Sequence, residues 1–257
     1  MNRLRNIKKK LYPNNLINRW LLNFNGSKGC LGRDNQDSEV QSFMSDMNNR
    51  GCDISAVYRV KNGEESIEMS ILSIAPLVRE IIFVDNGSTD NTIDIVQRLK
   101  FQLKDKVDIR IFRYEIETAL AGKGYLQRVM DNPVSSLSRF YSYCFSQATS
   151  NYLMKCDAHY VFIPKGLTKI AKAIEGNSCD IIYYSGLEMH GKEMGLEPFI
   201  FNQSSGYVFE DTELYEKIKF KSNKRRVIRT PLFFHVKRLS YIKYSLKGDA
   251  LKEKYGK

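Results

Sequence analysis

The chain has 257 residues, 42% of them hydrophobic, so it can form one large packed domain or two small ones, and a disordered or fibrous protein is excluded. No apolar run reaches the roughly 18 residues of a membrane span, and we expect no secretory signal. Its five cysteines are scattered and odd in number, which argues against a disulfide framework or zinc knuckle and favours the cytoplasm.

The net charge of +11 is concentrated at the two ends of the chain. Residues 1–20 carry +6 and residues 217–257 carry +12, which leaves −7 for residues 21–216. Basic ends favour attraction to an anionic membrane surface, at its inner face, or to a phosphorylated acceptor. Solvated termini that merely aid solubility are an open alternative. No nucleic-acid motif accompanies the charge, so nucleic acid is not an expected partner.

From residue 53 onward, predicted strands and helices alternate, which is typical of an α/β protein with a mostly parallel sheet and helices on both faces. Residues 115–134 are predicted to be rich in loops, and the helix that follows begins at a cap, Ser135 or Ser136. The predicted strands are 54–60, 81–84, 109–114, 152–156 and 180–184; the predicted helices are 64–74, 93–99, 135–145, 165–174 and 212–218.

The segment from Glu80 to Thr92, EIIFVDNGSTDNT, is the most informative in the chain. A buried strand runs into Asp85, a tight polar loop follows, and a helix leaves that loop. Ligands of open α/β sheets bind at the carboxyl ends of strands, so Asp85 and Asn86 stand where a ligand is expected. The competing interpretation is that Asp85 only caps its own turn.

A second strand also ends in a carboxylate, at Asp157-Ala-His159. Two strand-terminal acids on one edge of a parallel sheet can address the same ligand. An Asp and a His two residues apart can chelate a divalent metal, and a mixed oxygen and imidazole set suits Mn²⁺. Such a metal could hold a diphosphate. Alternatively, His159 is a structural residue beside Tyr160.

Three segments, taken in order and spacing, resemble family 2 glycosyltransferases of the GT-A fold. They are ISAVYRVKNGEE (54–65), IFVDNGSTDNT (82–92) and LMKCDAH (153–159). The resemblance covers residues 53–211 and weakens after Tyr184. It implies a basic N-terminal extension (1–50), a GT-A catalytic domain (51–216), and a basic C-terminal segment (217–257) that packs on or extends the catalytic domain.

The resemblance implies a nucleotide-sugar site built from two loops. Asp85 and Asn86 would hold uracil or ribose, although many relatives have a second acid where this chain has Asn86. Arg139 would contact the diphosphate, with a surface role as the alternative. The residues implied to line base and ribose are Arg59, Lys61, Asn62 and Glu64.

The resemblance also implies a metal, Mn²⁺ or Mg²⁺, held by Asp157, His159 and a third ligand. Most relatives have Asp-X-Asp here, but Asp-X-His occurs in a related group of GT-A enzymes. His235 is the better candidate for the third ligand, and His190 could instead touch the acceptor. Asp157 belongs to the nucleotide-sugar site as well, through the metal.

Relatives usually place the general base after a Gly-rich acceptor loop, and GYVFEDT (206–212) resembles that element. Asp211 is the first candidate and Glu210 the second, with Glu188 and Glu197 in reserve. The alternative is that Glu210 and Asp211 cap the predicted helix 212–218.

The expected function is metal-dependent, inverting transfer of a sugar from a nucleotide sugar, a UDP-sugar first, to a glycan or lipid-linked saccharide. A retaining mechanism stays open because Asp-X-His is known from retaining enzymes. The main rival is a non-catalytic GT-A module that binds nucleotide or glycan as a scaffold, which the substitutions at Asn86 and His159 motivate. The sugar, the acceptor and the linkage are not identified by the sequence.

Overall fold

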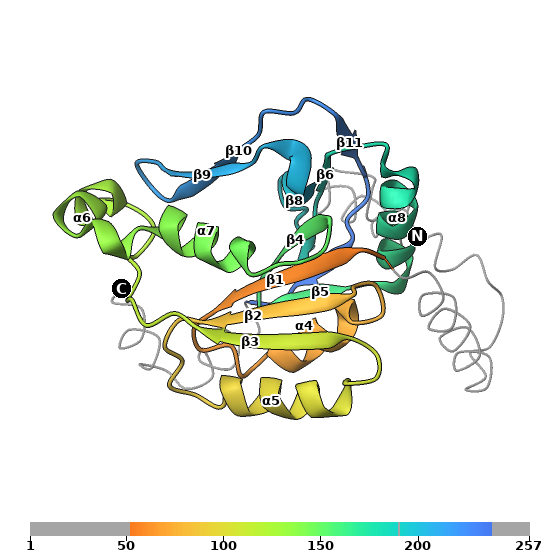
Figure 1. Ribbon diagram of the computed structural model, residues 1–257, viewed down its shortest axis with the longest axis horizontal. Helices are drawn as coiled ribbons and strands as arrows, with labels where there is room; N and C mark the ends of the chain where they lie inside the picture. The colour runs from red at the N-terminus through yellow and green to blue at the C-terminus, as the bar shows by residue number, and fades with distance from the viewer. Residues whose placement is uncertain (1–51, 190, 238–257) are drawn as a thin grey trace, which may run out of the picture. The chain divides into compact units, whose positions relative to one another are not determined.

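A central seven-stranded sheet organises the computed structural model, which describes residues 52–189 and 191–237 (Figure 1). The strand order is β11-β6-β8-β4-β1-β2-β3, and β8 alone pairs antiparallel to its neighbours. The predicted mostly parallel sheet is therefore confirmed. The predicted extension 1–50 lies outside the described residues. The seven strands are β1 (Ile54–Val60), β2 (Glu80–Asp85), β3 (Asp108–Arg113), β4 (Tyr152–Cys156), β6 (Ile181–Tyr184), β8 (Glu197–Asn202) and β11 (Arg225–Val227).

Helices cover both faces of this sheet, as predicted (Figure 1). The helices α4 and α5 lie under β1 to β3, and the Tyr58 hydroxyl of β1 is 3.0 Å from the Ser70 hydroxyl of α4. On the opposite face α7 packs its aromatic side, Phe140 and Phe145, against buried residues of β1, β2 and β4. None of the described helices is both long and apolar enough to cross a membrane. The helices are α4 (Ile67–Ile74), α5 (Thr92–Gln102), α6 (Tyr125–Asp131), α7 (Leu137–Ser146) and α8 (Pro164–Ile174), with short 3-10 turns at Pro133–Ser135, Glu175–Asn177 and Gln203–Ser205.

Two smaller sheets complete the described part. A hairpin joins β9 (Val208–Asp211) to β10 (Glu216–Lys219), and β5 (Tyr160–Phe162), β12 (Phe233–His235) and β7 (Leu187–Glu188) form a three-stranded sheet. The basic segment that begins at residue 217 thus contributes β11 to the central sheet and β12 to the small one.

The predicted helix over residues 212–218 is wrong, because this stretch turns back and forms β10. Partly buried and exposed residues alternate along β10, as in a strand, and Ile218 pairs with Phe209 across the hairpin. The turn is closed by the Thr212 amide, which donates to the Tyr215 carbonyl at 2.9 Å. Glu210 and Asp211 therefore cannot cap a helix that begins at residue 212.

The loop-rich stretch 115–134 contains one short helix, α6, that the sequence pattern did not predict. Ser136 is the cap of α7, since its hydroxyl accepts a hydrogen bond from the Arg139 amide at 3.2 Å. Of the two predicted caps, the second is correct.

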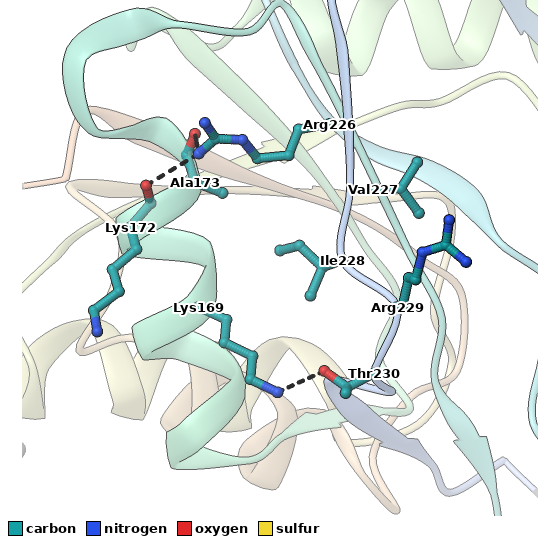
Figure 2. Close-up of a pocket in the computed structure, with 8 residues that line it drawn as sticks. All are labelled: Lys169, Lys172, Ala173, Arg226, Val227, Ile228, Arg229 and Thr230. Carbon is teal, nitrogen blue, oxygen red and sulfur yellow. Dashed lines mark hydrogen bonds between the residues drawn. The ribbon is translucent and has the colours of Figure 1, made fainter. Parts of the chain in front are cut away.

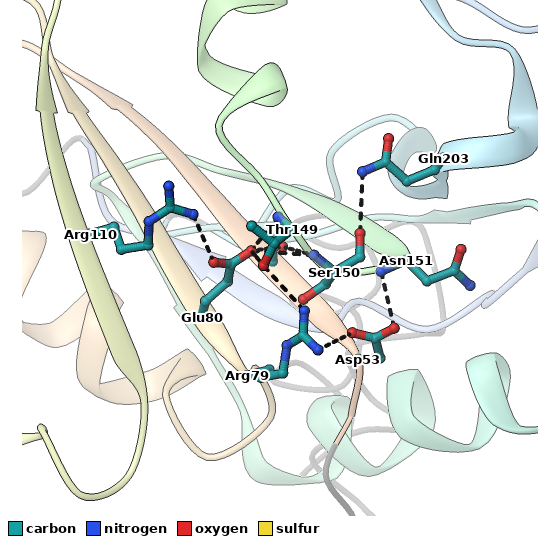
Figure 3. A network of polar contacts seen from close by, with 9 residues as sticks. Asp53, Arg79, Glu80, Arg110, Thr149, Ser150, Asn151 and Gln203 are labelled. Carbon is teal, nitrogen blue, oxygen red and sulfur yellow. Dashed lines mark hydrogen bonds and ion pairs between the residues drawn. The ribbon is translucent and has the colours of Figure 1, made fainter.

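The amino ends of β1 and β2 are locked by a buried carboxylate, Glu80 (Figure 3). Its Oε1 accepts hydrogen bonds from the Ser55 hydroxyl at 2.5 Å and from the Thr149 amide at 2.5 Å, and its Oε2 lies 3.2 Å from Arg110 Nη1. Buried charge is costly unless it is paired and hydrogen-bonded, and Glu80 is both. This network fixes the strand register at the edge opposite to the polar carboxyl ends.

Candidate functional site

The carboxyl ends of β4, β1 and β2 lie side by side and bring the predicted polar residues together. Asp85 stands opposite Val60 in the β1–β2 register, and the Asn86 amide donates to the Val60 carbonyl at 2.8 Å. Asp157 follows directly after β4 on the other side of β1. Both strand-terminal acids therefore flank the end of β1, as the sequence pattern predicted.

Arg59 and Asp157 form a partly buried ion pair at this edge, with the Asp157 side chain 29% exposed. Arg59 Nη2 lies 2.6 Å from Asp157 Oδ1, and the Arg59 side chain is 4% exposed. The guanidinium carbon is 4.4 Å from the centroid of the Tyr141 ring on α7, within cation–π range. Burial alone would raise the pKa of the Asp157 carboxyl, but the charge of Arg59, with smaller contributions from His159, Lys155 and a hydrogen bond to Tyr160, lowers that pKa to about 2. Asp157 is therefore a carboxylate at neutral pH.

His159 lies beside Asp157 and carries a neutral ring. Its Nε2 is 3.9 Å from Asp157 Oδ2, too far for a hydrogen bond. Burial lowers the pKa of the His159 imidazole to about 4, although the Asp157 carboxylate opposes that shift. A neutral imidazole keeps the lone pair that a metal ligand needs.

His235 approaches His159 from the small sheet. The two ring centroids are 4.7 Å apart, and the Val236 amide, next to His235, donates to the His159 carbonyl at 2.9 Å. His235 Nδ1 lies 3.1 Å from Glu188 Oε2, and both ring nitrogens of His235 are buried with no hydrogen bond among the described residues. A carboxylate behind a histidine is a common arrangement around metal ligands.

The donor chemistry of these residues fits a divalent metal in part. Two ligands that each lie about 2 Å from one ion are up to about 4 Å apart, and the 3.9 Å between Asp157 Oδ2 and His159 Nε2 is within that range. A buried imidazole nitrogen without a partner, on His235, supplies a third donor nearby. However, no set of three or more carboxylate, imidazole or thiolate groups in the described part is arranged closely enough to form a metal centre.

Asp85 and Asn86 are both buried and both hydrogen-bonded within the protein. Asp85 accepts from the Gly87 amide at 3.1 Å and from the Ser88 amide at 3.1 Å, so it caps its own turn. Asn86 donates to the Ile116 carbonyl at 2.8 Å, and its Oδ1 accepts from the Thr118 hydroxyl at 3.0 Å. Asp85 therefore stabilises its own loop at the carboxyl edge of the sheet. Asn86 connects that loop to the segment after β3 by hydrogen bonds.

The two loops at the ends of β1 and β2 are fastened to each other. Asn62 Oδ1 accepts from the Thr89 amide at 2.8 Å, and Glu64 Oε2 accepts from the Asn91 amide at 3.1 Å. Lys61 is exposed and lies 3.5 Å from Glu117. Arg139 is exposed near the start of α7. Loop residues predicted to line the nucleotide thus shape the rim of the site in this structure.

Asp211 is engaged by the start of α7. Its carboxylate accepts from the Ser136 hydroxyl at 2.6 Å, from the Ser138 amide at 3.0 Å and from the Tyr125 hydroxyl. Partial burial would raise the pKa of Asp211, but these hydrogen bonds outweigh it and hold that pKa below the ordinary value. Glu210 points to the other side of β9 and pairs with Lys219.

Glu216 and Tyr141 were not singled out from the sequence. Glu216 lies on β10 beside Tyr141 and within the electrostatic reach of Arg59, and burial raises its pKa against that charge. Tyr141 could have been found from its place on the sheet-facing side of α7. No sequence signal marks Glu216, because it fell in a stretch predicted to be helical. Of the remaining predicted residues, Glu197 pairs with Lys155 at 3.4 Å, and His190 lies outside the described residues.

A surface hollow of about 450 Å³ lies away from this edge, between α8 and residues 226–230 (Figure 2). Its basic residues are used in packing: Arg226 donates to the Ala173 carbonyl at 3.0 Å, and Lys169 donates to the Thr230 hydroxyl at 2.6 Å. The hollow has no acid or histidine in its lining. It therefore lacks the carboxylate that a sugar-transfer site needs as a general base.

The sheet order and the two strand-terminal acids agree with the GT-A fold that the sequence resemblance implies. Residues 55–122 match the family model described as Glycosyl transferase family 2. The predicted resemblance to this family is confirmed over that segment. No curated protein matches the chain by sequence.

Solved structures with the same fold include S. aureus TarS. The crystal structure of TarS aligns with a TM-score of 0.52 and 13% identity, over 77% of this chain and 39% of that one. TarS 1–349 in complex with UDP-GlcNAc aligns with a TM-score of 0.50 and 15% identity, over 70% of this chain and 57% of that one. This chain spans well under two thirds of either TarS chain, and at these identities the likeness establishes the fold alone.

Proposed function

We propose that the protein transfers a sugar from a nucleotide sugar, a UDP-sugar first, to a hydroxyl of a glycan or lipid-linked saccharide. The observation that carries the proposal is the position of Asp85 and Asp157 on either side of the carboxyl end of β1. Asp85 lies within the segment that matches the family, and Asp157 follows the strand that pairs with β1 of that segment. The TarS complex with UDP-GlcNAc, which has this fold, supports the choice of donor.

The nucleotide would occupy the rim formed by the loops after β1 and β2. Asp85 holds its turn by accepting from the Gly87 and Ser88 amides, and Asn62 and Glu64 fix the facing loop. We assign base and ribose contacts to this rim, with Lys61 at its exposed side. Arg139, exposed near the start of α7, would reach the diphosphate.

In the transfer step, the acceptor oxygen bonds to the anomeric carbon while the bond from that carbon to the diphosphate oxygen breaks. Charge builds up on the departing diphosphate. A divalent metal, Mn²⁺ or Mg²⁺, held by Asp157, His159 and His235, would supply the positive charge that stabilises it. The neutral ring of His159 and the ionised carboxyl of Asp157 suit this role.

The proton of the acceptor hydroxyl passes to a carboxylate on the β9–β10 hairpin. Asp211 is our first candidate, because it follows the Gly-rich loop, and Glu210 is the second. Glu216 enters as a competitor because its raised pKa brings it closer to the range in which a general base works best. An inverting outcome is proposed, with a single displacement at the anomeric carbon.

The test is transfer or hydrolysis of UDP-sugars by the full chain in the presence of Mn²⁺, with Asp157→Ala beside the wild type. We expect turnover by the wild type and a loss of at least about 100-fold in the variant. Activity that is unchanged in Asp157→Ala, or absent with every donor, would contradict the proposal. Proton NMR of the anomeric centre of the product then distinguishes inversion from retention.

The second candidate function is a scaffold that binds nucleotide without turnover. It is favoured by the full engagement of Asn86 and Asp211 within the protein. Calorimetry decides between the two: tight UDP binding that ignores Mn²⁺, with no turnover, supports the scaffold.

A further inference from the structure

Arg59 is a buried cation held next to the proposed metal ligands. Besides its ion pair with Asp157, the guanidinium lies over the Tyr141 ring and 5.7 Å from the centroid of the Phe145 ring. Its Nε and Nη1 are buried and form no hydrogen bond with any described residue. The positive charge is therefore fixed beside Asp157 and poorly screened by water.

The two oxygens of the Asp157 carboxylate face different neighbours. Oδ1 is taken by Arg59 at 2.6 Å, and Oδ2 faces His159 at 3.9 Å. The Arg59 bond orients the carboxylate, as partners behind a metal ligand do. At the same time Arg59 and Asp157 together carry no net charge, so the carboxylate attracts a cation less than an unpaired one would. A divalent ion at Oδ2 would also lie close to a like charge in a poorly hydrated site, where repulsion is strong.

We infer that Arg59 is a positioning residue that keeps Asp157 neutralised until an anionic diphosphate arrives, so that the cation and the nucleotide bind together and the cation alone binds weakly. The diphosphate restores the negative charge that Arg59 cancels. The inference rests on the proposed function, because it takes the donor to be a nucleoside diphosphate derivative. It adds that Mn²⁺ and the nucleotide each strengthen the binding of the other, by the same factor.

Mn²⁺ binding by the full chain, followed by electron paramagnetic resonance of the free ion, tests this without any turnover. We expect UDP to tighten Mn²⁺ binding by the wild type about 10-fold or more. Arg59→Met should bind Mn²⁺ about 10-fold more tightly than the wild type when no nucleotide is present, and UDP should add little. Arg59→Lys, which keeps the charge, should resemble the wild type.

Arg110→Met is the matched control, since Arg110 also pairs with a buried carboxylate, Glu80, but at the opposite edge of the sheet. It should leave Mn²⁺ binding as in the wild type. Removal of Arg59 leaves the partly buried Asp157 carboxylate without its ion pair, so Mn²⁺ should also raise the melting temperature of Arg59→Met more than that of the wild type.

Three outcomes would overturn the inference. Tight Mn²⁺ binding by the wild type without nucleotide does so by itself, even if Arg59→Met fails to fold. Equal Mn²⁺ affinity of Arg59→Met and the wild type does so as well. If UDP binds but does not change the affinity for Mn²⁺, the inference fails and the donor assignment stands. If neither UDP nor Mn²⁺ binds to any form of the protein, the proposed function itself fails.

Discussion

Asp211 accepts a hydrogen bond from the Ser136 hydroxyl at 2.6 Å, which ties strand β9 to the cap of helix α7. The Ser138 amide donates to the same carboxylate at 3.0 Å. A negative charge at a helix N-terminus is favourable, so Asp211 has a structural role whatever its part in the reaction. This double position makes it the first residue to test.

Asp211→Asn should lower kcat by about 100-fold or more if Asp211 takes the acceptor proton, with UDP affinity unchanged. Glu216→Gln should then cause a much smaller loss. The acid limb of the rate profile gives an independent check. The pKa of Asp211 is held below the ordinary value, so an acid limb that Asp211 causes should lie below about pH 4, the ordinary pKa of an aspartate. An acid limb above the usual carboxyl range, abolished in Glu216→Gln, would instead assign the base to Glu216, whose pKa is raised.

Tyr125→Phe should destabilise the protein by about 1–3 kcal/mol. The Tyr125 hydroxyl donates to Asp211 and accepts from the Leu137 amide at 2.9 Å, so its removal leaves both groups without that partner. Urea denaturation measures the change. Tyr143→Phe is the control, because the Tyr143 hydroxyl makes no hydrogen bond with the described residues; equal midpoints for the two variants would refute the prediction.

Stability should fall at acid pH through Glu80. Burial would raise the pKa of this carboxyl, but hydrogen bonds from Ser55 and Thr149 outweigh it and lower the pKa below 4.5 in the folded protein. The unfolded chain therefore binds the proton first as pH falls, and the stabilisation present above pH 4.5 is lost as the pH drops through the folded pKa.

The comparison that isolates this effect is Glu80→Gln. Its free energy of unfolding should be lower than that of the wild type near neutral pH, and it should fall less steeply between neutral and acid pH. Asp94→Asn on exposed α5 is the matched control and should parallel the wild type. Parallel curves for Glu80→Gln and the wild type would show that Glu80 does not carry the dependence.

Gly63→Ala should disturb the Asp157-Ala-His159 turn from the neighbouring loop. An added Cβ would lie 2.9 Å from the Ala158 Cβ and 2.9 Å from Val60 Cγ1. The loop cannot easily yield, because the Gly63 amide donates to the Thr92 hydroxyl at 2.7 Å. We expect about 1–3 kcal/mol of destabilisation and weaker UDP binding. Gly195→Ala meets no atom within 4 Å and should behave as the wild type in both measurements.

The parallel core of this fold was predictable from sequence because its strands are apolar runs that end in polar turns. β1 and β4 were predicted with their observed bounds, and the α7 cap was one of two candidates. The strand ends then predicted which acids share an edge, because parallel pairing brings carboxyl ends together.

What the sequence did not predict depends on partners that are distant along the chain. Residues 212–218 look helical in isolation, yet Ile218 forms a strand because Phe209 is available to pair. The ion pair of Arg59 with Asp157 joins residues on two neighbouring strands, and no local pattern indicates it. The same holds for Glu216, whose burial arises from the fold of the hairpin against α7.

The histidine pair has one further consequence. His159 follows β4 of the central sheet, whereas His235 is carried by β12 of the small sheet, and the two rings meet because β12 pairs with β5 directly after the Asp157–His159 turn. The candidate metal centre therefore lies where the central sheet and the small sheet meet. A fragment that stops before β12 can keep the complete β1 to β4 framework and still lack one wall of the centre. Truncated forms of this chain should therefore be judged by cation binding as well as by folding.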